Sequence, residues 1–468
     1  MLDDALDFQA GLRDKPVWQP LPDEVRAHLR EPLPRKGQGP ESVYRSFLDN
    51  VLPYTNGNRH PRFFGWVQGN GFPLAMLADM LAAGMNPHMA GFAQAPAVVE
   101  EQVLSWLTEL MGMPDTASGL LVSGGSIANL LGLAVARHVG CGFDVRREGL
   151  HGDHPRLVVY GSTETHNWAQ RSVELLGLGR EGLRLVRVDA DYRMDLDDLS
   201  RQIAEDRRAG LRPVAVIATA GSVNTGAIDD MAALRQLCDR EALWLHVDGA
   251  FGALARLVPG QAARMAGIES ADSLAFDLHK WMYLPFEIAC VLVRDGQAHR
   301  DAFAMTASYI AQEERGVIAG GLPFADRGIE LTRGFKALKA WMCLKSFGVD
   351  AFAEIIERNI AQAADFGRRV EAHPRLELLA AVTLNIVCFC YRSPLERGGV
   401  GSEELNRELL LRLQESGLAV VSSTRLGGRF ALRCCIVNHR TRQADLDALL
   451  EAVVSLGDQL SQASASMV

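Results

Sequence analysis

Short apolar runs and amphipathic helical stretches alternate along the middle of the chain. Five runs are almost continuously apolar: GLLVS at 119–123, LVVYG at 157–161, LRLVRV at 183–188, VAVIATA at 214–220 and LWLHV at 243–247. Four segments between them have helical spacing: 126–137, 166–176, 196–209 and 231–242. Apolar strands separated by amphipathic helices are typical of a mostly parallel sheet with helices on both faces. The pattern therefore predicts an α/β protein.

The two ends of the chain follow other patterns. Residues 1–59 are rich in proline and only 41–52 has helical spacing, so this segment lacks a core of its own. After a predicted helix at 350–372, the chain alternates short strands with two helices. The strands are expected at 376–380, 385–391, 419–423 and 429–436, and the helices at 403–416 and 443–459. We therefore expect an N-terminal segment at 1–60, a large domain at 61–345 and a smaller C-terminal α+β domain at 346–468.

Composition narrows the class of protein. The 468 residues are 48% hydrophobic and 22% charged, as in ordinary soluble globular proteins. The net charge of −9 and the lack of a long basic run argue against nucleic acid or a membrane surface as a partner. The acidic start of the chain does not resemble a signal peptide, and no apolar run approaches the roughly 20 residues of a membrane span. Eight scattered cysteines lack the spacing of a zinc site, so we expect no metal and a cytoplasmic location.

Two of the predicted strands end in groups that can carry chemistry. The strand at 243–247 ends at Asp248, and the strand at 273–276 is followed by His279 and Lys280. Ligands of open α/β sheets bind beyond the carboxyl ends of the strands. A lysine amine can hold the aldehyde of pyridoxal 5′-phosphate (PLP) as a Schiff base, while a carboxylate keeps the ring nitrogen protonated. The pair therefore predicts a PLP site, although either residue alone is more often a solvated surface group.

The segment VSGGS at 122–126 predicts a strand, a glycine turn and the start of a helix. Free backbone N–H groups at such a helix start can bind a phosphate. A tight turn with an ordinary serine cap would have the same pattern, and no GK[ST] follows as in a Walker loop. The acid and lysine downstream favour phosphate binding. A phosphate-binding module without covalent chemistry remains the alternative.

The motif HVDGAFG at 246–252, followed by DLHKW at 277–281, resembles the group II PLP-dependent amino-acid decarboxylases. That family includes the aromatic-L-amino-acid, histidine and glutamate decarboxylases, and the resemblance extends from about His60 to the C-terminus. It implies the PLP-dependent transferase fold type I, as in aspartate aminotransferase. It also implies a carbon–carbon lyase that works as a homodimer with shared active sites, in which the N-terminal segment packs across the partner subunit.

The resemblance assigns catalytic roles to four residues. Lys280 matches the Schiff-base lysine, and Asp248 matches the partner of the pyridine nitrogen. His166 matches the imidazole that stacks on the ring and lies near the substrate carboxylate. Tyr309, in the polar and glycine-rich segment 306–324, matches the tyrosine of a mobile lid loop that delivers a proton to Cα after CO₂ leaves. Related aldehyde synthases lack this tyrosine, so its presence favours simple decarboxylation.

Further residues are expected to bind the cofactor. The resemblance places Gly125, Ser126 and His279 near the phosphate and packs Ala250 against the ring, while Thr219 approaches the ring from the strand before Asp248. Asp277 occupies a position where many relatives have asparagine. An ionised aspartate cannot donate a hydrogen bond from its side chain, so its contribution to phosphate binding differs from that of asparagine.

The substrate pocket is predicted by the same resemblance. Six residues match segments that contact the substrate: Trp66, Val67, Gln68, His88, Ala90 and Phe92. Two of them are aromatic and Ala90 is small, which favours an aromatic L-amino acid in a roomy pocket. A decarboxylase of an acidic or aliphatic amino acid remains open, as does another fold type I reaction such as amino transfer.

Overall fold

The computed structural model describes residues 1–305, 315–317, 323–393 and 403–465 of the chain. These residues form two compact units. One unit joins Met1–Asn70 to Ala361–Val468, and the other is Gly71–Ile360. The roles predicted for an N-terminal segment, a large domain and a small domain stay predictions.

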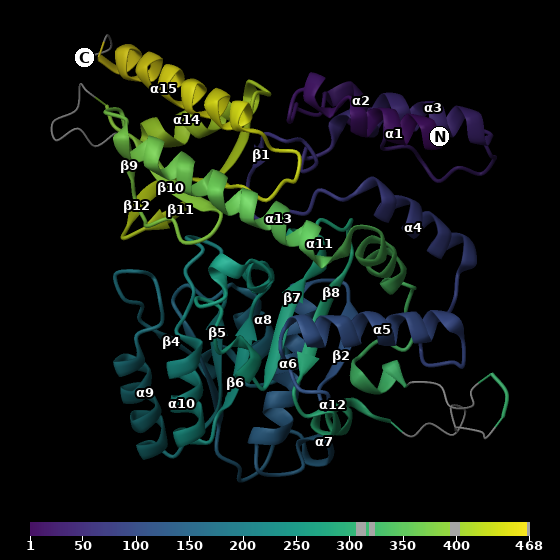
Figure 1. The fold of residues 1–468 in the computed structure, drawn as a ribbon, viewed down its shortest axis with the longest axis vertical. Coiled ribbons are helices and arrows are strands. Elements are labelled where there is room, and N and C mark those ends of the chain that lie inside the picture. The colour runs from purple at the N-terminus through teal and green to yellow at the C-terminus, as the bar shows by residue number, and fades with distance from the viewer. Residues whose placement is uncertain (306–314, 318–322, 394–402, 466–468) are drawn as a thin grey trace. The chain divides into compact units, whose positions relative to one another are not determined.

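The unit Gly71–Ile360 contains a seven-stranded sheet with the strand order β2-β8-β7-β6-β5-β3-β4 (Figure 1). Its strands are β2 (Ser118–Val122), β3 (Leu157–Ser162), β4 (Leu183–Val186), β5 (Arg212–Thr219), β6 (Trp244–Asp248), β7 (Ser273–Asp277) and β8 (Ala289–Val293). The pairs from β7 to β4 are parallel, whereas β8 runs antiparallel to both β2 and β7. The predicted mostly parallel α/β sheet is therefore confirmed.

Helices cover both faces of this sheet. The helices of the unit before α13 (Ala337–Ala372) are α4 (Pro73–Met85), α5 (Ala95–Leu110), α6 (Gly125–Gly140), α7 (Val145–Glu148), α8 (Trp168–Leu175), α9 (Leu196–Arg208), α10 (Met231–Glu241), α11 (Leu278–Trp281) and α12 (Gly296–Phe303). Helix α6 packs across β5, β6, β7 and β8, and Figure 1 shows α9 and α10 on the other side of the sheet. Asp195, Asp230 and Asp295 cap the starts of α9, α10 and α12 by accepting backbone N–H bonds. Such caps satisfy N–H groups that lack partners in the first turn of a helix.

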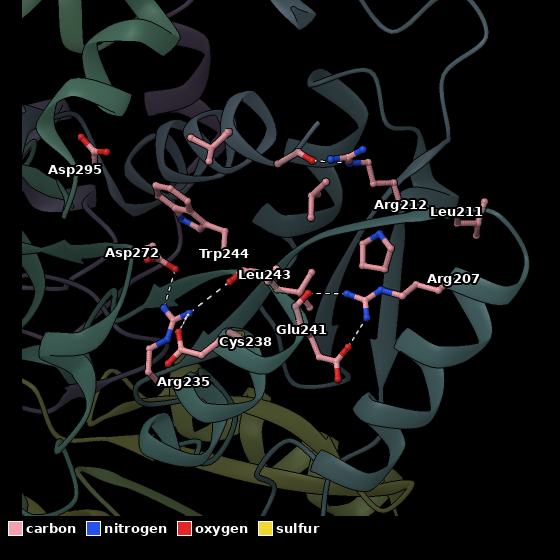
Figure 2. A pocket seen from close by; sticks show the side chains of 16 residues that line it. Arg207, Leu211, Arg212, Arg235, Cys238, Glu241, Leu243, Trp244, Asp272 and Asp295 are labelled. Carbon is pink, nitrogen blue, oxygen red and sulfur yellow. Dashed lines mark hydrogen bonds and ion pairs between the residues drawn. The ribbon is translucent and has the colours of Figure 1, made fainter. Parts of the chain in front are cut away.

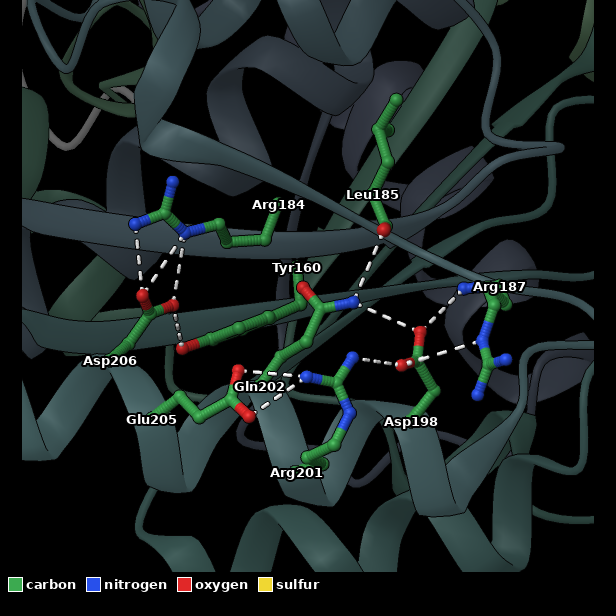
Figure 3. A network of polar contacts seen from close by, with 9 residues as sticks. All are labelled: Tyr160, Arg184, Leu185, Arg187, Asp198, Arg201, Gln202, Glu205 and Asp206. Carbon is green, nitrogen blue, oxygen red and sulfur yellow. Dashed lines mark hydrogen bonds and ion pairs between the residues drawn. The ribbon is translucent and has the colours of Figure 1, made fainter.

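A network of charged side chains connects the edge strand β4 to α9 (Figure 3). Asp206 of α9 accepts hydrogen bonds from the Tyr160 hydroxyl and from the Arg184 guanidinium, each at 2.9 Å. Asp198, in the first turn of α9, accepts a hydrogen bond from the backbone N–H of Arg187 at 2.9 Å. This N–H and the neighbouring side-chain donors lower the pKa of Asp198 to about 2. The edge of the sheet is thereby covered by a helix that is anchored to it.

The other unit contains a five-stranded sheet with the order β1-β11-β12-β10-β9. Its strands are β1 (Phe63–Phe64), β9 (Leu376–Leu378), β10 (Ile386–Tyr391), β11 (Val420–Leu426) and β12 (Arg429–Cys435). β1 pairs in parallel with β11, and the other neighbours are antiparallel. The C-terminal strands follow the predicted pattern. Two-residue β1 does not appear in that pattern, because so short a run shows no alternation.

The core of this unit lies between the sheet and three helices. Those helices are α14 (Glu403–Glu415), α15 (Gln443–Ala465) and the C-terminal part of α13 (Ala337–Ala372). Helix α13 is interrupted at Gly348, where φ is 74°. Glycine adopts such a positive φ at little cost, and the helix predicted at 350–372 begins just after this break.

The N-terminal helices of this unit are α1 (Leu2–Ala10), α2 (Asp23–His28) and α3 (Pro40–Asn50). Neither α2 nor α3 contains a buried residue. Apolar side chains such as Leu33, Val43 and Phe47 are exposed instead. Within a single chain, this segment therefore buries little apolar surface.

All eight cysteines are buried and none forms a disulfide. In the part of the chain that the structure describes, no helix combines the length and the apolar character needed to span a membrane.

Candidate active site

Lys280 lies just beyond the carboxyl end of β7, in the short helix α11. Its Nζ is 2.7 Å from Oδ2 of Asp277, the last residue of the strand. The Asp277 side chain is only 1% exposed, whereas the Lys280 side chain is 22% exposed. The lysine amine therefore has a buried counter-charge and keeps part of its surface accessible to a small molecule.

Asp248 ends the neighbouring strand β6, and its side chain is buried. Two donors hold the carboxylate. Nε1 of Trp168 donates to Oδ2 at 2.6 Å, and the backbone N–H of Ala250 donates to Oδ1 at 3.0 Å. Both groups donate and neither accepts, so they match a negatively charged carboxylate.

Parallel pairing brings these residues to one rim of the sheet. Thr219, at the end of β5, is paired with Asp248. Asp248 is paired with Ala275 of β7, two residues before Asp277. Because the carboxyl ends of parallel strands meet at the same edge, the acid and the lysine of separate motifs become neighbours.

Thr219 is fixed at this rim by Asp229. Its N–H donates to Oδ2 of Asp229 at 2.8 Å, and its carbonyl accepts the Asp229 N–H at 3.0 Å. Burial raises the pKa of the Asp229 carboxyl to about 6. Oγ1 of Thr219 is itself buried and has no hydrogen-bond partner among the described residues. Buried hydroxyls nearly always have a partner, so this one points to a group that the protein chain does not supply.

His166 lies in the turn between β3 and α8. Its Nδ1 accepts the backbone N–H of Trp168 at 3.3 Å, so the neutral ring carries its proton on Nε2. Loss of water around the ring lowers the pKa of His166, the nearby Lys280 charge adds to this, and the Asp248 charge opposes it. The structure thus brings a neutral imidazole within electrostatic reach of both the lysine and the acid.

The glycine turn at the end of β2 approaches the same carboxylate. Helix α6 begins at Gly125, and a β-carbon added there would lie 2.8 Å from Oδ2 of Asp277. His279 also faces the turn, because its Cε1 lies 3.8 Å from the place of a β-carbon on Gly124. Ser126 is exposed in the first turn of α6. The N–H groups of a first helical turn have no partner within the helix and form a site suited to phosphate.

The predicted pocket residues fall in both units. Trp66, Val67 and Gln68 belong to the unit that contains the chain termini, where Trp66 is 52% exposed and Val67 is buried. His88 and Phe92 belong to Gly71–Ile360 and form an edge-to-face ring pair with centroids 5.5 Å apart.

Ala90 lies beside this pair, since its backbone N–H donates to Nδ1 of His88 at 3.2 Å. The contact of all six pocket residues with substrate stays a prediction. Tyr309 and most of the predicted lid lie outside the described residues, so the proton-donor role of Tyr309 also stays a prediction.

A cavity of about 670 Å³ lies where β5 and β6 begin, at the opposite end of these strands from Asp248 (Figure 2). Its arginines bind acids of the protein itself. Arg235 pairs with Asp272 at 2.8 Å, and Arg207 pairs with Glu241. The described lining of this cavity includes none of the residues predicted to bind the cofactor or substrate. Size alone therefore does not identify the active site in this molecule.

Known proteins share both the sequence and the fold. The family model for the pyridoxal-dependent decarboxylase conserved domain matches residues 22–392. The chain belongs to the pyridoxal-dependent decarboxylase family. It therefore has the PLP-dependent fold type I, PLP is its cofactor, and it is a carboxy-lyase. The resemblance seen in the two motifs is confirmed.

Relatives within the pyridoxal-dependent decarboxylase family match over most of their length. An aromatic-L-amino-acid decarboxylase from Bacillus atrophaeus is 35% identical over 460 residues, which cover 97% of this chain and 94% of the relative. An acidic amino acid decarboxylase from Mus musculus is 27% identical over 451 residues, covering 94% and 81%. The crystal structure of Oryza sativa TDC with PLP and tryptamine superposes with a TM-score of 0.89 at 26% identity, covering 97% and 96%.

The residues at the rim fit the chemical groups of PLP. Lys280 offers an amine for the aldehyde, and the buried Asp248 offers a charge for the ring nitrogen. The Thr219 hydroxyl, which has no partner in the described part of the chain, and the close-packed turn at Gly125 offer donors beside them. Each of these residues therefore matches one group of PLP by its chemistry, and the role of each residue in the reaction stays a prediction.

Two residues of the site carry no recognisable signal in the sequence. Trp168 follows His166 by two positions and marks only the buried start of a helix. Asp229 is one of two adjacent aspartates after a turn, where the second one, Asp230, caps α10. Their contacts with Asp248 and Thr219 join residues 80 and 10 positions apart, which local patterns do not reveal.

Proposed function

We propose that this decarboxylase acts on an aromatic L-amino acid and releases CO₂ and the corresponding amine. The placement of Lys280 and Asp248 at adjacent strand ends, with His166 beside both, carries the proposal. The 35% identity to an aromatic-L-amino-acid decarboxylase supports the aromatic substrate class. The similarity to a decarboxylase named for acidic amino acids keeps an acidic substrate as the alternative.

Each residue of the rim has a task in this reaction. When bound, PLP withdraws electrons from the bond between Cα and the departing carboxylate. Nζ of Lys280 supplies the amine that binds the cofactor aldehyde. The charge of Asp248 holds a proton at the ring nitrogen. The neutral imidazole of His166 covers the ring and presents its Nε2–H to the substrate carboxylate.

The remaining residues bind and orient the cofactor. Backbone N–H groups at Gly125 and Ser126 bind the phosphate at the start of α6, and His279 lies beside them. The hydroxyl of Thr219 donates to the cofactor, which satisfies its missing hydrogen bond. The small side chain of Ala250 leaves room for a flat ring.

The pocket residues favour an aromatic side chain in the substrate. Trp66 and Phe92 offer flat apolar surfaces, and Ala90 leaves space for a ring. Val67, Gln68 and His88, the other residues predicted to contact substrate, carry no permanent positive charge. A substrate with an acidic side chain usually requires such a charge for its second carboxylate.

The proposal includes a homodimer in the cytoplasm with shared active sites and a small-molecule substrate. Residues 1–60 cover the partner subunit, and Tyr309 delivers its proton from the partner's loop. The exposed apolar side chains of α3 and α4, such as Phe47 and Met85, support an interface. The eight cysteines without disulfides support a reducing compartment.

The test is CO₂ release from a panel of L-amino acids with added PLP, together with identification of the organic products. Release from tryptophan, tyrosine or phenylalanine with the matching amine would support the proposal. Release from glutamate or aspartate alone would overturn the substrate class. An oxo acid formed without CO₂ would indicate amino transfer, and the absence of CO₂ release from every aromatic member of the panel would overturn the proposed substrate class.

A further inference from the structure

Trp168 contacts both His166 and Asp248. Its indole Nε1 donates to Oδ2 of Asp248 at 2.6 Å, and its backbone N–H donates to Nδ1 of His166 at 3.3 Å. The side chain is almost fully buried, with 2% exposed. A single residue thus connects the acid proposed to hold the ring nitrogen with the imidazole proposed to cover the ring.

The surroundings leave the indole little freedom. Trp168 packs in a core formed by α6, α8 and the strands β3 and β5. Its ring meets that of His246 nearly at right angles, with centroids 5.6 Å apart. His246 is itself held from both sides, because Nδ1 lies 2.7 Å from Oγ of Ser273 and Nε2 lies 2.7 Å from Oδ1 of Asn129. Burial lowers the pKa of His246 to about 4, so this ring stays neutral. Close-packed neighbours of this kind keep a side chain in one rotamer.

The hydrogen bond between Trp168 and Asp248 can run in one direction only, from the indole to the carboxylate. An indole N–H donates and cannot accept a hydrogen bond, so it matches a carboxylate in its charged form. Hydrogen bonds to ionised acceptors are shorter and stronger than neutral ones, and this contact is at the short end of the range. The second donor, the N–H of Ala250, reaches only Oδ1. Without the indole N–H, Oδ2 of Asp248 would lose the donor that it has among the described residues.

We propose that Trp168 is a positioning residue that acts through Asp248. It keeps the carboxylate charged and in the orientation that holds a proton at the ring nitrogen of the cofactor. This inference rests on the proposed function of Asp248. It predicts that Trp168 contributes to the binding of a pyridine ring and not to the binding of a ring that lacks the nitrogen.

The test compares two cofactors on the full-length protein after removal of its own cofactor. Calorimetric titration gives the Kd for PLP and for its carbocyclic analogue, in which CH replaces the ring nitrogen. Wild type binds PLP more tightly than the analogue. Trp168→Phe keeps an aromatic ring and removes the N–H, and it reduces this preference about 10-fold, the size expected for a hydrogen bond to a charged group. The affinity for the analogue stays within about 2-fold of wild type, since no charge on the ring is involved.

Trp244→Phe is the matched control. The indole of Trp244 donates to Oγ of Ser273 at 2.8 Å, and Ser273 also holds His246. This variant therefore removes an N–H from the core around Trp168 without removing a donor from Asp248. The preference of Trp244→Phe for PLP over the carbocyclic analogue equals that of wild type. In Trp168→Phe, kcat falls while KM changes little, because the lost contact acts on the reacting ring.

Three outcomes would overturn the inference. An equal loss of affinity for PLP and the analogue would show that Trp168 acts through packing alone. An unchanged preference in Trp168→Phe would show that the N–H does not matter. A wild type without any preference would remove the proposed role of Asp248 itself. If Trp168→Phe does not fold, 3-benzothienylalanine at position 168 removes the N–H and keeps the shape of the ring system.

Discussion

Nζ of Lys280 lies 2.7 Å from Oδ2 of Asp277, while Oδ1 of the same carboxylate is buried without a hydrogen-bond partner among the described residues. The turn at Gly125 comes so close that a β-carbon there would lie 2.8 Å from this side chain. A buried acid therefore stands beside the turn that we propose for the phosphate. The lysine ammonium balances its charge, and a carboxylate at this place cannot donate a bond to phosphate.

Asp277→Asn is therefore expected to tighten PLP binding. An amide removes a negative charge next to the phosphate and supplies two donors, so the Kd for PLP falls about 3- to 10-fold. Calorimetric titration measures the change. Asp295→Asn, at the cap of α12, is the control acid and leaves the Kd unchanged. Weaker binding in Asp277→Asn would show that the carboxylate is needed to hold Lys280 in place.

Asp229 is expected to make stability depend on pH. Burial raises its folded-state pKa to about 6, above the value of about 3.9 in an unfolded chain. The folded protein therefore keeps a proton that the unfolded chain releases, and the free energy of unfolding falls as the pH rises from 4 to 6. The loss over this range amounts to about 2 kcal/mol.

Asp229→Asn lacks this titration. The free energy of unfolding of wild type relative to Asp229→Asn is thus about 2 kcal/mol higher at pH 4 than at pH 7. Urea unfolding at both pH values, with the same cofactor content, measures the difference. A difference that stays constant across this range would contradict the assignment.

Tyr309→Phe is expected to change the product. The resemblance to the decarboxylase family gives Tyr309 the task of protonating Cα, and related aldehyde synthases lack this tyrosine. The variant therefore loses amine formation, and in the presence of oxygen it yields aldehyde and peroxide. Product analysis with and without oxygen follows the change. Amine formation at the wild-type rate would remove Tyr309 as the proton donor.

The enzyme is expected to be a dimer at the concentrations used for assays. Helices α2 and α3 bury none of their residues within one chain, so their apolar side chains are open to contact with a partner subunit. Sedimentation of the active enzyme tests this, and deletion of residues 1–60 should shift it toward monomer with loss of activity. A fully active monomer would contradict the shared-site proposal.

The sheet was predictable because its strands are buried on both faces and read as continuous apolar runs. The ends of these runs also predicted that Asp248 and Lys280 meet at one rim, since parallel strands align their carboxyl ends. The glycine turn at Gly125 was visible for a similar reason, as it falls between a strand and a helix. Strand β1 was not visible, because its partner β11 lies more than 350 residues away in the chain.

The supporting residues were not predictable from local patterns. Trp168 and Asp229 act through hydrogen bonds to residues of other elements, and neither has a spacing that signals a site. The same holds for His246, whose two hydrogen bonds reach Asn129 and Ser273. Motifs thus reveal the groups that meet the cofactor, whereas the groups that hold them in place emerge only from the folded chain.

The most direct test of the account is to locate the lysine that binds the cofactor. Borohydride converts a lysine–PLP link into a stable secondary amine, which peptide mass spectrometry can map in the full-length enzyme. The account predicts a pyridoxyl group on the peptide that contains Lys280, and neither the label nor turnover in Lys280→Ala. A label on another lysine of wild type, or normal turnover in Lys280→Ala, would contradict it.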